Sequence, residues 1–124
     1  MAWKLFSSGV AVFFALGAIY VYGLAAGFFF TLWWWDILLH MIGGVLAGLI
    51  GMWFFVISGR RVSYAEALCG AIVLGILVEI AEFIFGFTYS PFMSYPVDTL
   101  KDIGDDAIGG LLVAYLVLRS WPQK

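Results

Sequence analysis

The sequence is poor in charged residues, cysteine and histidine. Only 11% of its 124 residues are charged, whereas an average soluble domain has roughly 25%. Hydrophobic residues make up 65%, and the mean hydropathy is +1.06. This composition excludes an ordinary soluble domain and indicates an integral membrane protein. A single cysteine, Cys69, also excludes an internal disulfide framework.

Basic residues are equally scarce, and they do not gather into a patch. The chain has six of them and a formal net charge of −2, so no nucleic-acid partner is expected. The sequence also lacks Gly-x-Ser-x-Gly, P-loop, haem-attachment and cysteine-rich metal motifs. Any chemistry must therefore come from single polar residues within the apolar segments.

Apolar segments of membrane length occupy nearly the whole chain. A helix needs roughly 20 apolar residues to cross the hydrocarbon core of a bilayer. The runs here predict four such helices, at about 5–27, 33–58, 64–87 and 98–119. We expect an all-α polytopic membrane protein in which residues 1–124 form a single transmembrane domain, a compact four-helix bundle.

The connections between these segments carry local signals. Pro91 and Pro96 disfavour helix before the fourth segment. The indole rings of Trp33, Trp34 and Trp35 suit the headgroup region, where an N–H stays hydrated while the ring is buried. The tryptophan run therefore marks one membrane surface.

The basic residues predict the orientation of the bundle. Only Lys101 lies on one side, and the opposite side holds Lys4, Arg60, Arg61, Arg119 and Lys124. Because cytoplasmic loops are enriched in lysine and arginine, both termini are expected in the cytoplasm. The tryptophan run and the proline-containing connection then face outward.

Seven of the eight carboxylates, and the single histidine, fall in the outward halves of the last three segments. They are Asp36, His40, Glu79, Glu82, Asp98, Asp102, Asp105 and Asp106. Spacings of three or four residues place most of them on one face of each helix. At about 1.5 Å per residue, His40, Glu79 and Asp106 lie at similar depths, about 10–12 Å from the helix ends. Three polar stripes are therefore expected to converge inside the bundle.

Ionisable groups at such depth suggest function, because burying them costs several kcal/mol each. Seven carboxylates cannot all stay ionised there without cations, so we expect protonation or a divalent metal. An oxygen-rich set with one imidazole suits Mg, Mn, Fe or Zn, and no other cofactor is expected. The predicted metal ligands are Asp36, His40, Asp102 and Asp106.

The remaining acids receive other roles. Glu79 and Glu82 are the predicted catalytic residues, with one or the other acting as the general base. Asp98 is expected to cap the fourth helix, where a side-chain oxygen meets free N–H groups. Asp105 points about 100° away from the polar face and is expected to be peripheral.

Three short motifs follow one another along the last three segments. They are Asp36-Ile-Leu-Leu-His40, Glu79-Ile-Ala-Glu82 and Asp102-Ile-Gly-Asp105-Asp106-Ala-Ile-Gly109. In this pattern the chain resembles VanZ-like membrane proteins and the related YjdF-type inner membrane proteins, over about Asp36 to Gly110. It departs from them at Ile37, Glu82 and Asp106, where such chains often have lysine, glutamine and asparagine. The resemblance implies a small multi-pass protein of the bacterial or archaeal inner membrane, active at the cell envelope, but names no reaction.

These observations predict a membrane-embedded, metal-dependent hydrolase or transferase acting on a lipid-linked or phosphorylated envelope substrate. Two alternatives stay open. A cation- or proton-coupled binding or transport protein would use the same acids as a relay, although the inner half shows no continuing polar path. A non-enzymatic accessory or assembly subunit would use them to hold a membrane-protein partner, a lipid headgroup or a cation.

Overall fold

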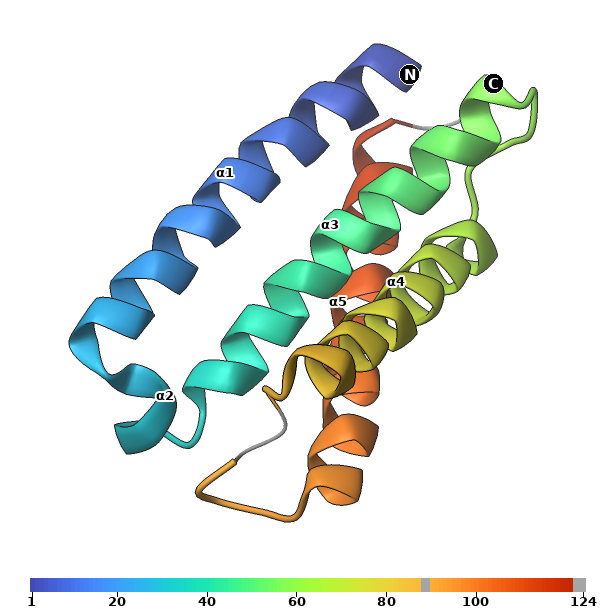
Figure 1. Cartoon of the computed structure of the whole chain (residues 1–124). Coiled ribbons are helices and arrows are strands. Elements are labelled where there is room, and N and C mark those ends of the chain that lie inside the picture. The colour runs from blue at the N-terminus through green and yellow to red at the C-terminus, as the bar shows by residue number, and fades with distance from the viewer. Residues whose placement is uncertain (88–89, 122–124) are drawn as a thin grey trace.

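The computed structural model describes residues 1–87 and 90–121, and every regular element in these ranges is an α-helix (Figure 1). Three helices are long and apolar enough to cross a membrane: α1 (Ala2–Ala26), α3 (Trp35–Ile57) and α4 (Tyr64–Phe85). A short helix, α2 (Phe28–Thr31), joins α1 to α3, and α5 (Tyr95–Ser120) completes the chain. The all-helical, membrane-type fold is confirmed. Of the residues considered above, Lys124 lies outside the described ranges.

Local sequence signals explain where the helices end. Helices α1 and α4 stop at Gly27 and Gly86, which have φ angles of 69° and 78°. Only glycine adopts this left-handed conformation at little cost. At the start of α4, the Ser63 hydroxyl accepts a hydrogen bond from the Ala65 amide at 3.2 Å, which satisfies one free donor of the first turn.

Helix α5 begins earlier than expected, at Tyr95, and two predictions fail for this reason. Pro96 does not stop the helix, because it occupies the first turn, where its missing N–H leaves no bond unmade. Asp98 is not the cap, because Ser94 holds that position. Asp98 lies inside the first turn instead, where its carboxylate still favours the helix dipole.

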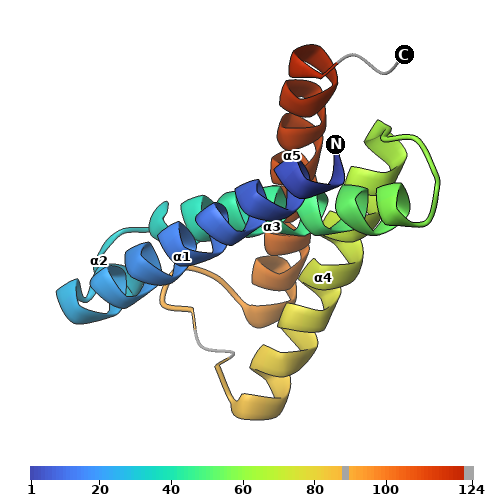
Figure 2. The ribbon, with the colours of Figure 1, turned by 90° about the horizontal axis from the view of Figure 1, so that it is seen from above.

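Helix α3 is the centre of the structure. Helices α1, α4 and α5 all pack against it, and α4 also packs against α5. Within the described residues α1 packs on neither α4 nor α5. Figure 2 shows α4 diverging from α1 toward its Phe85 end. One side of α3 is therefore left uncovered between α1 and α4.

Glycines allow the closest helix approaches. A Cβ on Gly44 would lie 2.7 Å from the Asp106 Cα, and one on Gly51 would lie 2.6 Å from the Glu66 carbonyl oxygen. Such distances leave no room for a side chain, so α3 meets α5 and α4 backbone to backbone. Small residues serve the same purpose in other membrane bundles.

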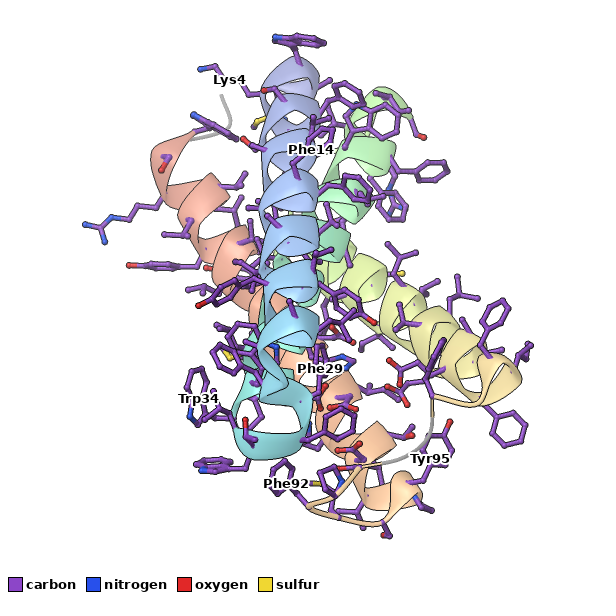
Figure 3. All side chains as sticks on the ribbon, turned by 60° about the vertical axis from the view of Figure 1, so that its left-hand side comes forward. Lys4, Phe14, Phe29, Trp34, Phe92 and Tyr95 are labelled. Atoms are coloured by element: carbon purple, nitrogen blue, oxygen red, sulfur yellow. The ribbon has the colours of Figure 1, made fainter. Side chains whose placement is uncertain are left out.

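Aromatic side chains gather at the α2 end of the bundle. Figure 3 shows Trp34 and Phe92 there, while Lys4 lies at the opposite end. Trp33 and Trp34 are exposed, as a membrane-surface position requires. Trp35 is buried and its Nε1 has no hydrogen-bond partner among the described residues, so the prediction that its N–H stays hydrated is wrong. Its ring packs on Phe28, with centroids 4.9 Å apart, and against Gly23, where α1 leaves space for the indole.

Replacing Gly44 with alanine tests the contact between α3 and α5. The added methyl group would overlap the Asp106 backbone, so we expect a loss of about 1–3 kcal/mol in the free energy of unfolding. Thermal unfolding in detergent, followed by circular dichroism, measures the change. Gly104→Ala is the control, because a Cβ there meets nothing within 4 Å. Equal stability of the two variants would contradict the close contact.

Candidate functional site

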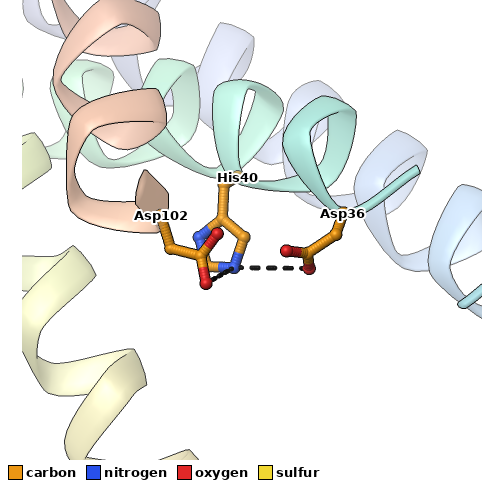
Figure 4. A group of neighbouring side chains, drawn as sticks. All are labelled: Asp36, His40 and Asp102. Carbon is orange, nitrogen blue, oxygen red and sulfur yellow. Dashed lines mark ion pairs between the residues drawn. The ribbon is translucent and has the colours of Figure 1, made fainter. Parts of the chain in front are cut away.

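The single histidine is surrounded by carboxylates from two helices. His40 lies on α3 and is 9% exposed. Its Nε2 atom is 3.7 Å from Asp36 Oδ1, one turn earlier on α3, and 3.6 Å from Asp102 Oδ2 on α5 (Figure 4). On the other side of the ring, Nδ1 is 3.4 Å from Asp106 Oδ2. The structure thus brings together all four residues predicted as metal ligands.

Lys101 also belongs to this group, although no role in the site was predicted for it. Its ammonium lies 2.7 Å from Asp36 Oδ2 and also contacts Asp102 Oδ1. Each of these two aspartates therefore gives one oxygen to Lys101 and turns the other toward His40 Nε2. A signal was present in the sequence, because Lys101 follows Asp98 by three residues and precedes Asp105 by four.

Lys101 also contacts Asp98 and Asp105, the two acids that were predicted to lie outside the metal site. Its ammonium is 3.6 Å from Asp98 Oδ1 and 3.8 Å from Asp105 Oδ2. The prediction that Asp105 is peripheral is wrong, because the flexible lysine side chain reaches across the faces of α5. Asp105 Oδ2 is buried and has no hydrogen-bond partner within the described ranges. The charged group thus contains five acids or bases of α5: Asp98, Lys101, Asp102, Asp105 and Asp106.

Glycines make room for Asp106 between three helices. A Cβ on Gly43 of α3 would lie 3.5 Å from Asp106 Oδ1, and one on Gly75 of α4 would lie 3.2 Å from its carboxyl carbon. The carboxylate therefore occupies space that larger residues would fill. This fixes Asp106 beside the Nδ1 edge of His40.

The two glutamates of α4 have different surroundings. Glu79 is 5% exposed, and its Oε2 accepts a hydrogen bond of 2.6 Å from the Thr99 hydroxyl on α5. Its other oxygen is buried and has no hydrogen-bond partner in the described part of the chain. Glu82 lines a cavity together with Asp36, His40 and Asp106. Within residues 1–87 and 90–121 its carboxylate has no hydrogen bond or ion pair.

This cavity lies between α1, α3 and α4 and has a volume of about 620 Å³. That volume is typical of small-molecule sites, which occupy about 300–1,000 Å³. Asp36, His40, Glu82 and Asp106 form its charged end, and the remaining walls are apolar apart from the Tyr20 hydroxyl. Among the wall residues are Leu16 of α1, Leu46 of α3 and Val78 of α4. The cavity thus combines a charged end with a long apolar wall.

Three residues of the group are spaced as the ligands of a metal ion would be. Asp36, His40 and Asp102 each offer one ligand atom, and these atoms lie within 4.8 Å of one another. Ligands at about 2.1 Å from a tetrahedral ion lie about 3.4 Å apart. The distances of 3.6 and 3.7 Å from His40 Nε2 to the two carboxylate oxygens are close to this value. Two carboxylates and an imidazole suit Zn, Fe or Mn.

Asp106 is placed for a different role from the other three. It meets Nδ1, the nitrogen that points away from Asp36 and Asp102. A carboxylate in this position accepts the ring N–H and leaves the opposite nitrogen free to bind a metal. The four predicted ligands therefore divide into three donors that face one another and one residue that orients His40.

No family model matches the chain, and neither the curated proteins nor the solved structures contain a match. The resemblance to VanZ-like proteins therefore rests on its three motifs alone and stays a prediction.

Replacing Lys101 with methionine removes the ammonium that faces four aspartates. Removing one partner of a fully buried ion pair lowers the free energy of unfolding by roughly 3–5 kcal/mol. We expect about 2 kcal/mol here, because the Asp36 side chain is 36% exposed and partly screened. Unfolding in detergent, measured in a double-mutant cycle with Asp36→Asn, should give a coupling energy of about 1–2 kcal/mol. The control cycle pairs Asp36→Asn with Arg61→Met and should be additive; additivity in the Lys101 cycle would contradict the ion pair.

Proposed function

We propose that the chain is a four-span protein of the bacterial or archaeal cytoplasmic membrane, with its charged group in the outward half. Helix α5 has 26 residues and packs along α3 and α4, which supports a fourth crossing beside α1, α3 and α4. The start of α1, the Ser120 end of α5 and the turn between α3 and α4 lie at one end of the bundle (Figure 1). Lys4, Arg60 and Arg119 belong to these segments, so the positive-inside rule places that end in the cytoplasm.

The activity we propose is metal-dependent hydrolysis or group transfer on a lipid-linked or phosphorylated substrate of the cell envelope. One observation carries this proposal: Asp36, His40, Glu82 and Asp106 line the same cavity as a long apolar wall. A molecule that fills the cavity is therefore amphiphilic, with its polar head near His40 and its apolar part between α1 and α4. A small polar substrate would leave most of the wall without a partner.

Each residue of the group has a role in this proposal. Asp36, His40 and Asp102 would hold a divalent metal, which would supply positive charge beside a phosphate or ester oxygen and lower the pKa of a bound water. Asp106 orients His40, and Lys101 holds the two carboxylates in place.

Glu82 is the better candidate for the general base. Its carboxylate lines the cavity and has no hydrogen-bond or ion-pair partner in the described ranges, so it is available to take a proton from water. Glu79 is held by Thr99 and does not line the cavity, which favours a structural role in joining α4 to α5.

Transport is less well supported than catalysis. Beyond Asp106, the buried face of α5 consists of Gly109, Gly110, Val113, Ala114 and Val117. Within the described residues the next buried carboxylate is Glu66, near the opposite end of α4. A proton or cation relay needs polar groups between these ends.

Metal binding tests the proposed ligands. Purified protein, stripped with a chelator and reloaded in detergent, should bind one divalent ion per chain. His40→Ala and Asp102→Asn should abolish binding, and Asp106→Asn should weaken it about 10–100-fold by releasing the ring. Glu66→Gln is the control, because Glu66 is a buried carboxylate that contacts Ser63 away from the site. Undiminished binding by a folded His40→Ala variant would exclude this metal site.

Glu82→Gln tests the proposed base. We expect the variant to retain the metal but to lose about 10²–10⁴-fold in turnover, the usual contribution of a positioned base. Release of phosphate from a long-chain alkyl phosphate in mixed micelles measures the rate. A metal-loaded wild-type protein that turns over neither phosphate nor ester amphiphiles would contradict the proposed activity. An unchanged rate in Glu82→Gln would contradict only the role of Glu82.

A further inference from the structure

The apolar part of the cavity continues along α1 and α3, away from the charged group. A second cavity of about 340 Å³ lies between these helices and is lined by apolar side chains and Gly9. Both cavities border on Phe13, Leu46 and Ile50. We call the combined lining the α1 groove. On α1 it runs from Val21 to Leu5, about 24 Å at 1.5 Å per residue.

The α1 groove is long compared with one leaflet of the membrane. One leaflet occupies about half of the roughly 30 Å hydrocarbon core, or about 15 Å. The α1 groove therefore extends beyond the depth of one leaflet, and it matches a long, flexible hydrocarbon chain better than a compact apolar molecule.

The α1 groove is open at its side. Helices α1 and α4 diverge and do not pack on each other (Figure 2). The lining residues Phe13, Tyr20 and Val21 are exposed on α1. On a helix of membrane-spanning length, these side chains meet lipid tails rather than water. A hydrocarbon chain can thus enter from the bilayer without crossing water.

We propose that the α1 groove binds the long hydrocarbon chain of an amphiphile that enters sideways from the bilayer and places a phosphate head at His40. The distribution of polar residues supports this orientation, because the acids and His40 lie at one end of the groove and the rest of its lining is almost wholly apolar. A phosphate alone would be repelled by Asp36, Glu82 and Asp106. The choice of head therefore rests on the proposed function, in which a divalent metal would bind the phosphate oxygens and reduce this repulsion.

Gly17 is the position at which the α1 groove can be filled with least disturbance. It lies on the groove-lining face of α1 between Phe13 and Tyr20, and a Cβ there meets nothing within 4 Å. A tryptophan at this position has room to extend into the groove. Gly104 on α5 is also exposed and open but does not line either cavity, so Gly104→Trp is the matched control.

The test uses a long-chain alkyl phosphate that carries a photoactivatable diazirine on its chain, added to the full-length, metal-loaded protein in lipid nanodiscs. Crosslinks are mapped by mass spectrometry. On wild-type α4 we expect them at Val78 and Ala81, which line the groove, in preference to Ile76 and Ile80 on the opposite face. Gly17→Trp should reduce the groove crosslinks about tenfold, which corresponds to about 1.4 kcal/mol of binding. Gly104→Trp should leave them unchanged.

The outcomes separate this inference from the proposed function. Equal labelling of both faces of α4, insensitive to Gly17→Trp, would overturn the chain site even if the protein binds metal. Labelling that is confined to the groove and lost in Gly17→Trp, with metal content unchanged, supports it. The same labelling pattern in a protein that binds no metal would support the chain site while contradicting the proposed function.

Discussion

Buried carboxylates must meet a cation or a hydrogen-bond donor, and this constraint governs how three helices of this protein come together. An unmatched charge in a low-dielectric bundle costs several kcal/mol. Lys101 meets Asp36 across the contact between α3 and α5, and Thr99 donates to Glu79 across the contact between α4 and α5. These bonds need close helices, which the glycines permit: at Gly44 and Gly51 a Cβ would overlap a neighbouring backbone. Polar matching and close packing thus depend on each other.

The same arrangement produces the cavity. Polar contacts and glycines bring α4 and α5 against α3, whereas α1 packs on α3 and α2 but on neither α4 nor α5 in the described structure. The space between α1 and α4 stays open, and its charged end is formed by Asp36, His40, Glu82 and Asp106. The cavity thus has an apolar wall beside charged residues, and both lie within helices of membrane-spanning length. These two properties favour an amphiphilic ligand.

Much of this could be predicted from the sequence, because helix length and spacing are local properties. The i, i+4 spacing of Asp36 with His40 and of Asp102 with Asp106 placed each pair on one face, and the structure brings these faces together. The features of the site that could not be predicted depend on the reach of side chains and on the rotation of helices about their axes. The long side chain of Lys101 gathers Asp105 into the group despite its angle on α5. Glu82 lines the cavity, whereas Glu79 is hydrogen-bonded to Thr99 of α5. This difference depends on the rotation of α4 about its axis, which is set by packing against neighbouring helices rather than by local sequence.

The central claim is that Asp36, His40 and Asp102 act together as the ligands of one divalent ion. X-ray absorption spectroscopy of the zinc-loaded protein measures this most directly, because the ring atoms of an imidazole add scattering beyond the first shell of ligands at about 2.0–2.2 Å, and carboxylates do not. We expect one imidazole nitrogen and at least two oxygen ligands in the wild-type protein, and no retained zinc in His40→Ala. A wild-type spectrum with oxygen ligands alone, or with sulfur from Cys69, would contradict it.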